Sequence, residues 1–289
     1  MAPTSRLFCF GLGYSAQVLA RQLRAEGWAI AGTRRGGNAG PEVAQLFAFD
    51  GTRPLAANAL EGVTHLLISI PPDAQGDPVL RICGAELIRR TGQFAWVGYL
   101  STTGVYGNRD GDVVDETSDL RPNPGRSTWR AGAEAQWSQL QLEHGLPVQI
   151  FRLAGIYGPG RNALLTVRAG KAQRIDAPGH LFSRIHVDDI ATVLRASMAQ
   201  PNPGAIYNVC DDEPAESAEV IGYACELAGI APPPLVPLAE AALSPMAQSF
   251  YQDRRRVDNN RIKRELGVKL AYPSYREGLQ ALWADLTNG

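Results

Sequence analysis

Long apolar runs, an excess of one charge and paired cysteines are all missing from this chain of 289 residues. No apolar run reaches the length of a membrane span, and no signal-peptide pattern precedes the first apolar segment. With a formal net charge of −1, the chain offers no bulk electrostatic attraction for nucleic acid or an acidic membrane. We therefore expect a cytoplasmic protein that binds neither nucleic acid nor a membrane.

Patterns typical of disulfide or metal sites are missing as well. The four cysteines are scattered without a Cys-x-x-Cys pair, and the four histidines lack the spacing of metal ligands. The sequence therefore predicts reduced thiols and no metal site. What the chain does have is the composition of an ordinary globular protein, with 45% hydrophobic and 20% charged residues, and enough length for a full core.

The most informative stretch is a glycine-rich turn near the start of the chain. Residues 7–10 are apolar and predict a short buried strand, and residues 16–23 carry apolar side chains at helical spacing. Between them lie Gly11 and Gly13, and Ala16 takes the third small position of a Gly-x-Gly-x-x-Ala pattern. A strand, a tight glycine turn and a helix form the fingerprint that binds the pyrophosphate of a dinucleotide. In the alternative interpretation, the glycines make an ordinary turn.

Each position of this turn has a predicted role. Gly11 forms the sharp bend, and Gly13 lets the backbone approach a pyrophosphate. Ala16 allows the helix and the strand to pack closely. Tyr14 and Ser15 belong to the helix start, where free backbone amides and the positive end of the dipole hold phosphates.

The second expected strand covers residues 28–33 and begins about 20 residues after the first glycine, where the ribose-reading residue is expected. An NAD-specific site usually has Asp or Glu there, whereas this chain has Thr33 followed by Arg34 and Arg35. Two guanidinium groups suit the 2′-phosphate of NADP, so the sequence predicts NADP, with NAD as the alternative cofactor. The arginines also fit a second interpretation, as solvated loop residues.

Strand and helix patterns alternate along the chain. The expected strands continue at residues 46–49, 64–70, 94–100 and 206–209, and helical periodicity marks residues 79–90 and 127–143. This alternation predicts an α/β fold, in which helices cover both faces of a parallel sheet and ligands bind beyond the carboxyl ends of the strands. Asp50, Pro71 and Thr102 lie at such ends. We expect Asp50 and Pro71 to contact the cofactor, with Asp50 near its adenine.

Five segments together resemble one known family. Residues 100–107, Leu-Ser-Thr-Thr-Gly-Val-Tyr-Gly, resemble its "SSxxVYG" segment, and residues 150–161 resemble its "RpxxvYGPgR" strand and loop. Residues 183–191, 204–209 and 256–267 resemble its later "xxiHVdDla", "GxiyNv" and "DnsK…eLG" motifs. The family is the NAD-dependent epimerase/dehydratase group of extended short-chain dehydrogenases/reductases, which has atypical members, and the resemblance covers essentially the whole chain.

The resemblance implies a Rossmann domain over residues 1–160, whose sheet is completed by about residues 183–212, and a mainly substrate-binding part over residues 161–289. It also implies an NAD(P)-dependent oxidoreductase or epimerase/dehydratase-like enzyme that acts on a small polar or nucleotide-linked substrate. Family members often pair as homodimers through the equivalents of residues 79–90 and 127–143.

The reaction of this family uses a Ser or Thr at the end of the fifth strand and a Tyr-x-x-x-Lys pair on the following helix. Counted back from Tyr106, Thr102 matches the hydroxyl position that holds the substrate oxygen. Glu134 matches the Glu that follows the family's Lys. This alignment puts Arg126 at the Tyr position and Arg130 at the Lys position.

The two arginines are not equivalent replacements. Arg130 can replace Lys as a fixed cation against the nicotinamide ribose or a phosphate. Arg126 cannot replace Tyr as the acid/base, because a guanidinium stays protonated at physiological pH. In the alternative interpretation, Arg126, Arg130 and Glu134 form one charged stripe that faces solvent.

A substitute acid would have to come from elsewhere in the chain. Tyr157 and His186 lie in motifs that flank the substrate crevice in the family, and both side chains can exchange protons. Each also fits a purely structural role at its position. Because the usual Tyr is missing, a second hypothesis is a non-catalytic sensor of NADP(H) that presents a surface to a partner.

Overall fold

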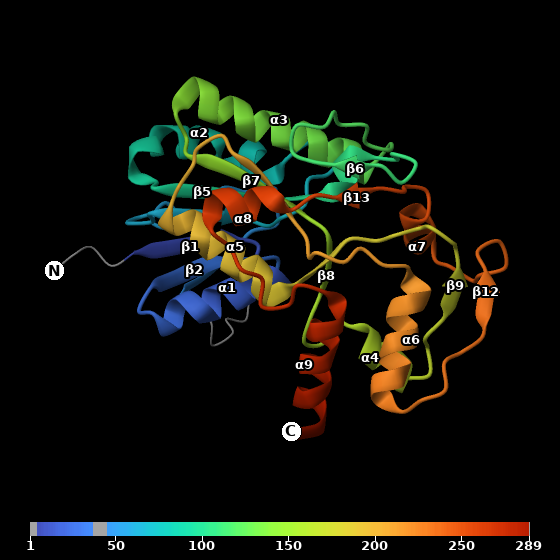
Figure 1. Cartoon of the computed structure of the whole chain (residues 1–289). Coiled ribbons are helices and arrows are strands. Elements are labelled where there is room, and N and C mark those ends of the chain that lie inside the picture. Colours follow the sequence, from blue (N-terminus) through green and yellow to red (C-terminus); the bar gives the residue numbers. More distant parts are fainter. Residues whose placement is uncertain (1–4, 37–44, 289) are drawn as a thin grey trace.

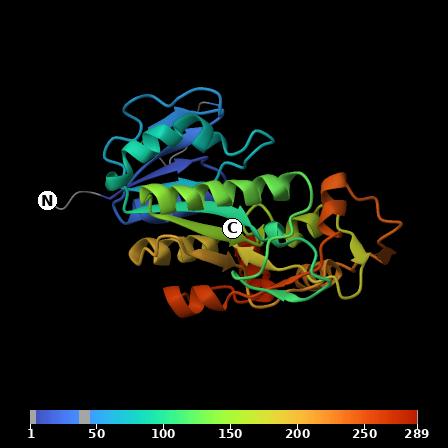
Figure 2. The ribbon, with the colours of Figure 1, turned by 90° about the horizontal axis from the view of Figure 1, so that it is seen from above.

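The computed structural model describes residues 5–36 and 45–288. Within them, a seven-stranded sheet lies between two layers of helices (Figures 1 and 2). In spatial order its strands are β3 (Gln45–Ala48), β2 (Ala29–Arg34), β1 (Arg6–Phe10), β4 (His65–Ile68), β5 (Trp96–Thr102), β7 (Val148–Leu153) and β11 (Ile206–Val209). All neighbouring pairs of this sheet are parallel, so the predicted doubly wound α/β fold is confirmed.

Two hydrophobic cores form on the two faces of the sheet. One core packs against α1 (Tyr14–Ala25), α5 (Val187–Ala199) and α8 (Asn260–Leu266). The other packs against α2 (Pro78–Arg89) and α3 (Arg126–His144). Because both faces are covered, the central strands are apolar throughout, as in β1, where every residue from Leu7 to Phe10 is fully buried.

Local sequence signals set the helix ends. The carboxylate of Asp77 caps α2 by accepting hydrogen bonds from the backbone N–H groups of Val79 and Leu80, and Pro78 occupies the first helical position. Gly145 ends α3 in the left-handed conformation, with φ of 67°.

The remaining elements surround the carboxyl ends of the strands. They are η2 (Thr103–Tyr106), β6 (Val113–Val114) paired with β13 (Arg256–Val257), and β8 (Gly155–Tyr157) paired with β10 (Arg184–His186). Further along lie α4 (Ala163–Arg168), β9 (Arg174–Asp176) paired with β12 (Leu235–Pro237), α6 (Ser217–Ala228), α7 (Pro245–Phe250) and α9 (Tyr275–Asn288). We call α4, β9, α6, β12, α7 and α9 the C-terminal lobe, which lies to the right and below in Figure 1.

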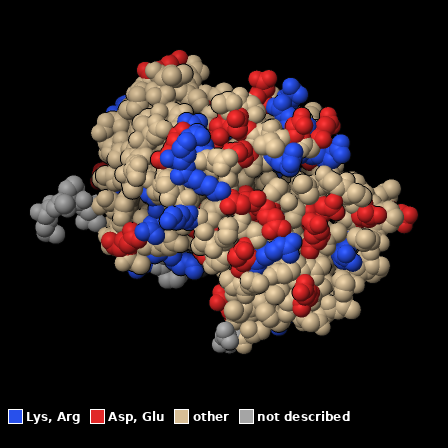
Figure 3. Space-filling model, viewed as in Figure 1, with Lys and Arg blue, Asp and Glu red and all other residues tan. Residues whose placement is uncertain are grey.

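Charges of both signs are interspersed over the face of the molecule in Figure 3. No helix in the described part of the chain is long and apolar enough to cross a membrane. The four cysteines are buried free thiols.

Candidate functional site

The candidate site begins where β1 and β4 lie side by side and the chain leaves them in opposite directions. After β1 it enters α1 on one face of the sheet, and after β4 it enters α2 on the other. Such a switch point opens a crevice at the carboxyl ends of the strands. Here the hydroxyl of Ser69 donates to the carbonyl of Gly11, whose own N–H donates to the hydroxyl of Thr33 at 2.9 Å. One turn therefore ties β4, β1 and β2 together.

Gly11 has a conformation and a setting that require glycine. Its φ is +90°, and a Cβ atom there would lie 2.8 Å from Cγ1 of Ile70. Ser69, which holds this turn, was not among the predicted site residues. The signal for it is a hydroxyl residue near the end of an otherwise apolar strand.

Gly13 is different, because a Cβ atom there would meet nothing within 4 Å. It precedes α1, whose amino end has no side-chain cap, so the first backbone N–H groups of the helix are open to an anion. Ser15 and Ala16 are buried against the sheet, and the hydroxyl of Tyr14 donates to the carbonyl of Pro159 at 2.9 Å. The space beside Gly13 is therefore open, and the binding of a pyrophosphate there stays a prediction.

Arg34 ends β2 beside this turn, and Arg35 follows it. The Nε of Arg34 donates to the carbonyl of Leu12 at 3.4 Å, which places its guanidinium next to the glycine turn, and Arg35 is exposed. The side chain of Thr33 is fully buried, and its hydroxyl accepts the Gly11 hydrogen bond, so Thr33 shapes the turn from within.

Asp50 and Pro71 are both exposed just beyond the ends of β3 and β4. The carboxylate of Asp50 accepts hydrogen bonds from the hydroxyl and the backbone N–H of Thr52, at 2.6 and 2.9 Å, and these bonds lower its pKa. Their contact with a cofactor stays a prediction.

Thr102 is the last residue of β5 and its side chain is half-buried. Its Oγ1 accepts a hydrogen bond from the N–H of Gly104 at 3.1 Å, so the hydroxyl proton stays available to donate. Ser127 on α3 was not predicted as a site residue. A Cβ atom on Gly104 would lie 3.2 Å from Oγ of Ser127 and 3.4 Å from Oγ1 of Thr102, so the two hydroxyls flank the same glycine.

Behind Thr102 lies a buried polar network that joins β5, α3 and β7. Arg152 forms an ion pair with Glu134, with 2.7 Å between Nη2 and Oε2, and Ser101 donates to the same carboxylate. Arg152 also donates to the hydroxyl of Tyr106, which donates to the side chain of Asn208. Burial raises the pKa of Tyr106 to about 12. The sequence signal for this network is a single arginine inside an apolar strand, which needs a buried partner.

The network corrects one interpretation of the sequence. Glu134 is 3% exposed and Arg130 is half-buried, so Arg126, Arg130 and Glu134 do not form a single solvent-facing stripe. The spacing of four residues places side chains on one helix face without telling whether that face is exposed.

Two solved structures share the fold of this chain over nearly its whole length. No family model matches the chain. The chain is 51% identical to a conserved protein of unknown function from Silicibacter pomeroyi DSS, over 98% of this chain and 99% of that one, with a TM-score of 0.88. It is 25% identical to a protein from Methylobacillus flagellatus assigned as an NAD-dependent epimerase/dehydratase, over 99% of this chain and all of that one, with a TM-score of 0.74. The predicted resemblance to the NAD-dependent epimerase/dehydratase group of extended short-chain dehydrogenases/reductases is therefore confirmed.

A curated relative spans nearly the same length. Protein YeeZ of Escherichia coli (strain K12) is 28% identical over 285 residues, which cover 91% of this chain and 94% of that protein. The similarity to YeeZ therefore extends over nearly the whole chain.

Compared with the motif of that family, α3 departs at its amino end. Arg126 is exposed on the first residue of the helix. Arg130 points to the sheet, where its Nη1 donates to the carbonyl of Leu100 at 2.8 Å and to the hydroxyl of Tyr99 at 3.2 Å. The guanidinium of Arg130 is therefore fixed beside the end of β5, at Leu100, which precedes Thr102 by two residues.

Tyr157 and His186 lie together on the paired strands β8 and β10, with ring centroids 5.1 Å apart. The hydroxyl of Tyr157 donates to the carbonyl of Ser274, and burial raises its pKa above the usual value. The Nδ1 of His186 accepts from the N–H of Asp188 at the start of α5, and burial lowers the pKa of His186. Both side chains thus have structural contacts, and a catalytic role for Tyr157 stays a prediction.

Proposed function

We propose that this chain is an NADP(H)-dependent enzyme that carries out a redox or epimerase/dehydratase-like reaction on a small polar or nucleotide-linked substrate. The observation that carries this proposal is the uncapped amino end of α1 beside Gly13, at the switch point between β1 and β4. The assignment of the Methylobacillus flagellatus relative as an NAD-dependent epimerase/dehydratase supports a nicotinamide cofactor and an epimerase/dehydratase-like reaction.

The chemistry divides between the cofactor and the chain. A bound nicotinamide supplies the hydride acceptor or donor. Thr102 has a hydroxyl proton free to donate to a substrate oxygen, because its Oγ1 already accepts from Gly104. Arg130, fixed by the carbonyl of Leu100, adds a positive charge that binds a ribose hydroxyl or a phosphate without transferring a proton.

The preference for NADP over NAD rests on Arg34 and Arg35. Both follow the buried part of β2, and no carboxylate lies among residues 28–36. A titration of tryptophan fluorescence with NADPH and NADH tests the preference. We expect NADPH to bind at least about tenfold more tightly, and Arg35→Ala to weaken NADPH but not NADH. Arg24→Ala, on the exposed far end of α1, is the control for the loss of one charge.

Catalysis is tested by turnover of a panel of carbonyl compounds and nucleotide sugars, followed by NADPH absorbance. We expect Thr102→Val to abolish turnover of any substrate found, while NADPH affinity stays within about twofold. Thr128→Val is the matched control, because Thr128 is exposed on α3 and donates to the carbonyl of Asn123. Full turnover by Thr102→Val would remove Thr102 from the mechanism.

The second candidate function is a non-catalytic NADP(H) sensor. The observation that favours it is Arg126, an exposed guanidinium where the family places its proton-transferring Tyr. Tight NADPH binding without turnover across the panel would favour the sensor. Failure of every nicotinamide dinucleotide to bind would exclude both functions.

A further inference from the structure

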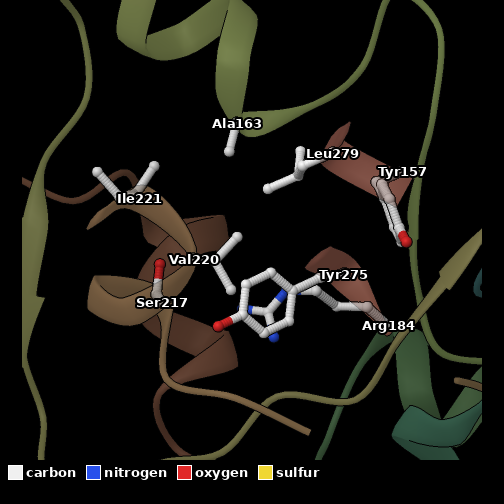
Figure 4. A pocket seen from close by; sticks show the side chains of 8 residues that line it. All are labelled: Tyr157, Ala163, Arg184, Ser217, Val220, Ile221, Tyr275 and Leu279. Carbon is white, nitrogen blue, oxygen red and sulfur yellow. The ribbon is translucent and has the colours of Figure 1, made fainter. Parts of the chain in front are cut away.

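A second hollow lies in the C-terminal lobe. It has a volume of about 200 Å³ and is enclosed by α4, α6, α9 and residues of β8 and β10 (Figure 4). Ala163, Val220, Ile221 and Leu279 give it apolar walls. A cavity of about 150 Å³ accommodates a molecule the size of benzene, so this one has room for a single ring or a branched chain. None of the residues that line it belongs to the glycine turn, β5 or α3.

A cation lies at the floor of this cavity. Nη1 of Arg184 donates to the carbonyls of Phe182 and Ala215, at 2.7 and 2.9 Å, and these bonds fix the guanidinium in place. Neither carbonyl carries a charge, and burial lowers the pKa of Arg184. Within the described residues, no carboxylate forms an ion pair with it. A guanidinium has five N–H donors in a planar fork, and only one of its nitrogens is used here.

Three acidic groups act on the cavity residues Tyr157 and Tyr275, and each of them bonds to a partner other than Arg184. Glu213 pairs with Arg276 at 3.1 Å, and Asp189 accepts hydrogen bonds from two backbone amides of the segment before α9. Glu277 accepts from Ser274. None of these three carboxylates therefore neutralises Arg184.

Asp211 is the remaining acid near Arg184. It is 2% exposed, and neither of its carboxylate oxygens has a hydrogen-bond partner in the described part of the chain. Burial raises its pKa to about 8, although the charge of Arg184 acts in the opposite direction. No hydrogen bond or ion pair joins the carboxylate of Asp211 to the guanidinium of Arg184 in the described part of the chain, so the unused N–H donors of the guanidinium are open to a ligand.

A hydroxyl without a partner also lines the cavity. Tyr275 on α9 is 1% exposed, and its hydroxyl has no hydrogen-bond partner among the described residues. Figure 4 shows this hydroxyl on the side of the cavity where Ser217 lies. A buried hydroxyl without a partner is costly, and a ligand that accepts a hydrogen bond removes that cost.

We propose that this cavity binds a small organic carboxylate, whose ring or branched chain lies against the apolar walls and whose carboxylate accepts hydrogen bonds from Arg184 and Tyr275. The planar fork of one guanidinium matches a carboxylate, and the apolar walls favour an organic acid over an inorganic anion. The residues that line this cavity lie outside the glycine turn that the proposed function assigns to the dinucleotide, although one of them, Tyr157, is also the predicted acid.

Isothermal titration of the full chain with benzoate tests the site, with benzamide as a neutral ligand of the same shape. We expect benzoate to bind about tenfold or more tightly than benzamide. Saturating NADPH must not displace benzoate. Displacement would place benzoate in the dinucleotide crevice and overturn the proposal. If inorganic phosphate bound to the cavity as tightly as benzoate, the apolar walls would not contribute to binding, and the proposal of an organic acid would be overturned.

Three variants locate the ligand. Arg184→Gln removes the charge, and we expect it to weaken benzoate about tenfold or more. Tyr275→Phe removes only the hydroxyl, and we expect a loss of about twofold to tenfold. Arg168→Gln, on the exposed face of α4, must leave binding unchanged.

Tyr275→Phe keeps the test decisive if Arg184→Gln fails to fold, because the ring that packs in the lobe remains. Unchanged benzoate affinity in Tyr275→Phe together with equal binding of benzoate and benzamide would overturn the proposal. So would the absence of benzoate binding to the unmodified protein.

Discussion

The amino ends of α1 and α3 both lie at the carboxyl edge of the sheet, and they differ in what they keep of the family pattern. At α1, the glycine turn and the open helix end have all the predicted parts. At α3, the buried partners Glu134 and Ser101 are in place, whereas the exposed first position carries Arg126 where the family has Tyr. A buried charge cannot lose its partner without a large cost in stability. An exposed residue with a role only in proton transfer can change without that cost.

The largest effect that this comparison predicts is in the buried network. Glu134→Gln leaves the guanidinium of Arg152 buried without a counter-charge, and we expect a loss of about 3–5 kcal/mol in the free energy of unfolding. Urea denaturation followed by circular dichroism measures it. Glu143→Gln, on the exposed end of the same helix, is the control and is expected to change stability by less than about 0.5 kcal/mol. Equal effects of the two variants would contradict the comparison.

Asp211 extends the contrast between buried and exposed charges to the C-terminal lobe. Its pKa is raised from 3.8 to about 8 in the folded protein, so the stability that its neutral form contributes is fully present below about pH 4. That contribution is lost as the pH rises toward 8. Asn at position 211 cannot ionise. We therefore expect the difference in unfolding free energy between Asp211→Asn and the unmodified protein to shift by a few kcal/mol in favour of the variant from pH 5 to pH 9.

Urea denaturation at pH 5, 7 and 9 checks this prediction for Asp211. Asp176→Asn is the control, because Asp176 is exposed on β9 and is not among the groups that act on Asp211. Parallel pH profiles for the unmodified protein and Asp211→Asn would show that Asp211 is already ionised in the folded state.

The two glycines of the turn are expected to affect different properties. Gly11 is expected to affect stability, and Gly13 is expected to affect NADPH binding. Gly11→Ala strains a left-handed backbone and places a Cβ atom 2.8 Å from Ile70, so we expect a loss of about 1–3 kcal/mol in stability. Gly13→Ala meets only open space and has an extended backbone, so we expect stability to change by less than about 1 kcal/mol. Its methyl group occupies the space proposed for the pyrophosphate, and we expect NADPH affinity to fall about tenfold.

Thermal denaturation and NADPH titration of both glycine variants make this comparison. If Gly13→Ala bound NADPH with normal affinity, the pyrophosphate would have to bind somewhere other than the amino end of α1. If Gly11→Ala were as stable as the unmodified protein, the turn or Ile70 would be able to shift and accept the added Cβ atom.

The sequence predicted the sheet and the glycine turn because those features repeat a strong local pattern. Apolar runs at regular intervals gave the strands, and Gly11 and Gly13 lie where the pattern placed them. Ser69, Ser127 and Arg152 were missed, because each gains its role from a contact with a residue far away in the chain. The cavity of the C-terminal lobe was not predicted for the same reason, since it is assembled from β8, β10 and three helices without a shared motif.

The smallest effects are expected at the two arginines of α3, and they test what replaced the family's Tyr and Lys. Arg130→Ala removes a cation that the carbonyl of Leu100 fixes beside β5, and we expect NADPH affinity to fall about threefold to tenfold. Arg126→Ala removes an exposed guanidinium, and we expect stability to stay within about 0.5 kcal/mol and NADPH affinity within about twofold. If Arg126→Ala lowered turnover or cofactor affinity as much as Arg130→Ala, the first residue of α3 would belong to the site after all. Arg126 would then have a functional role of its own at the position where the family has Tyr.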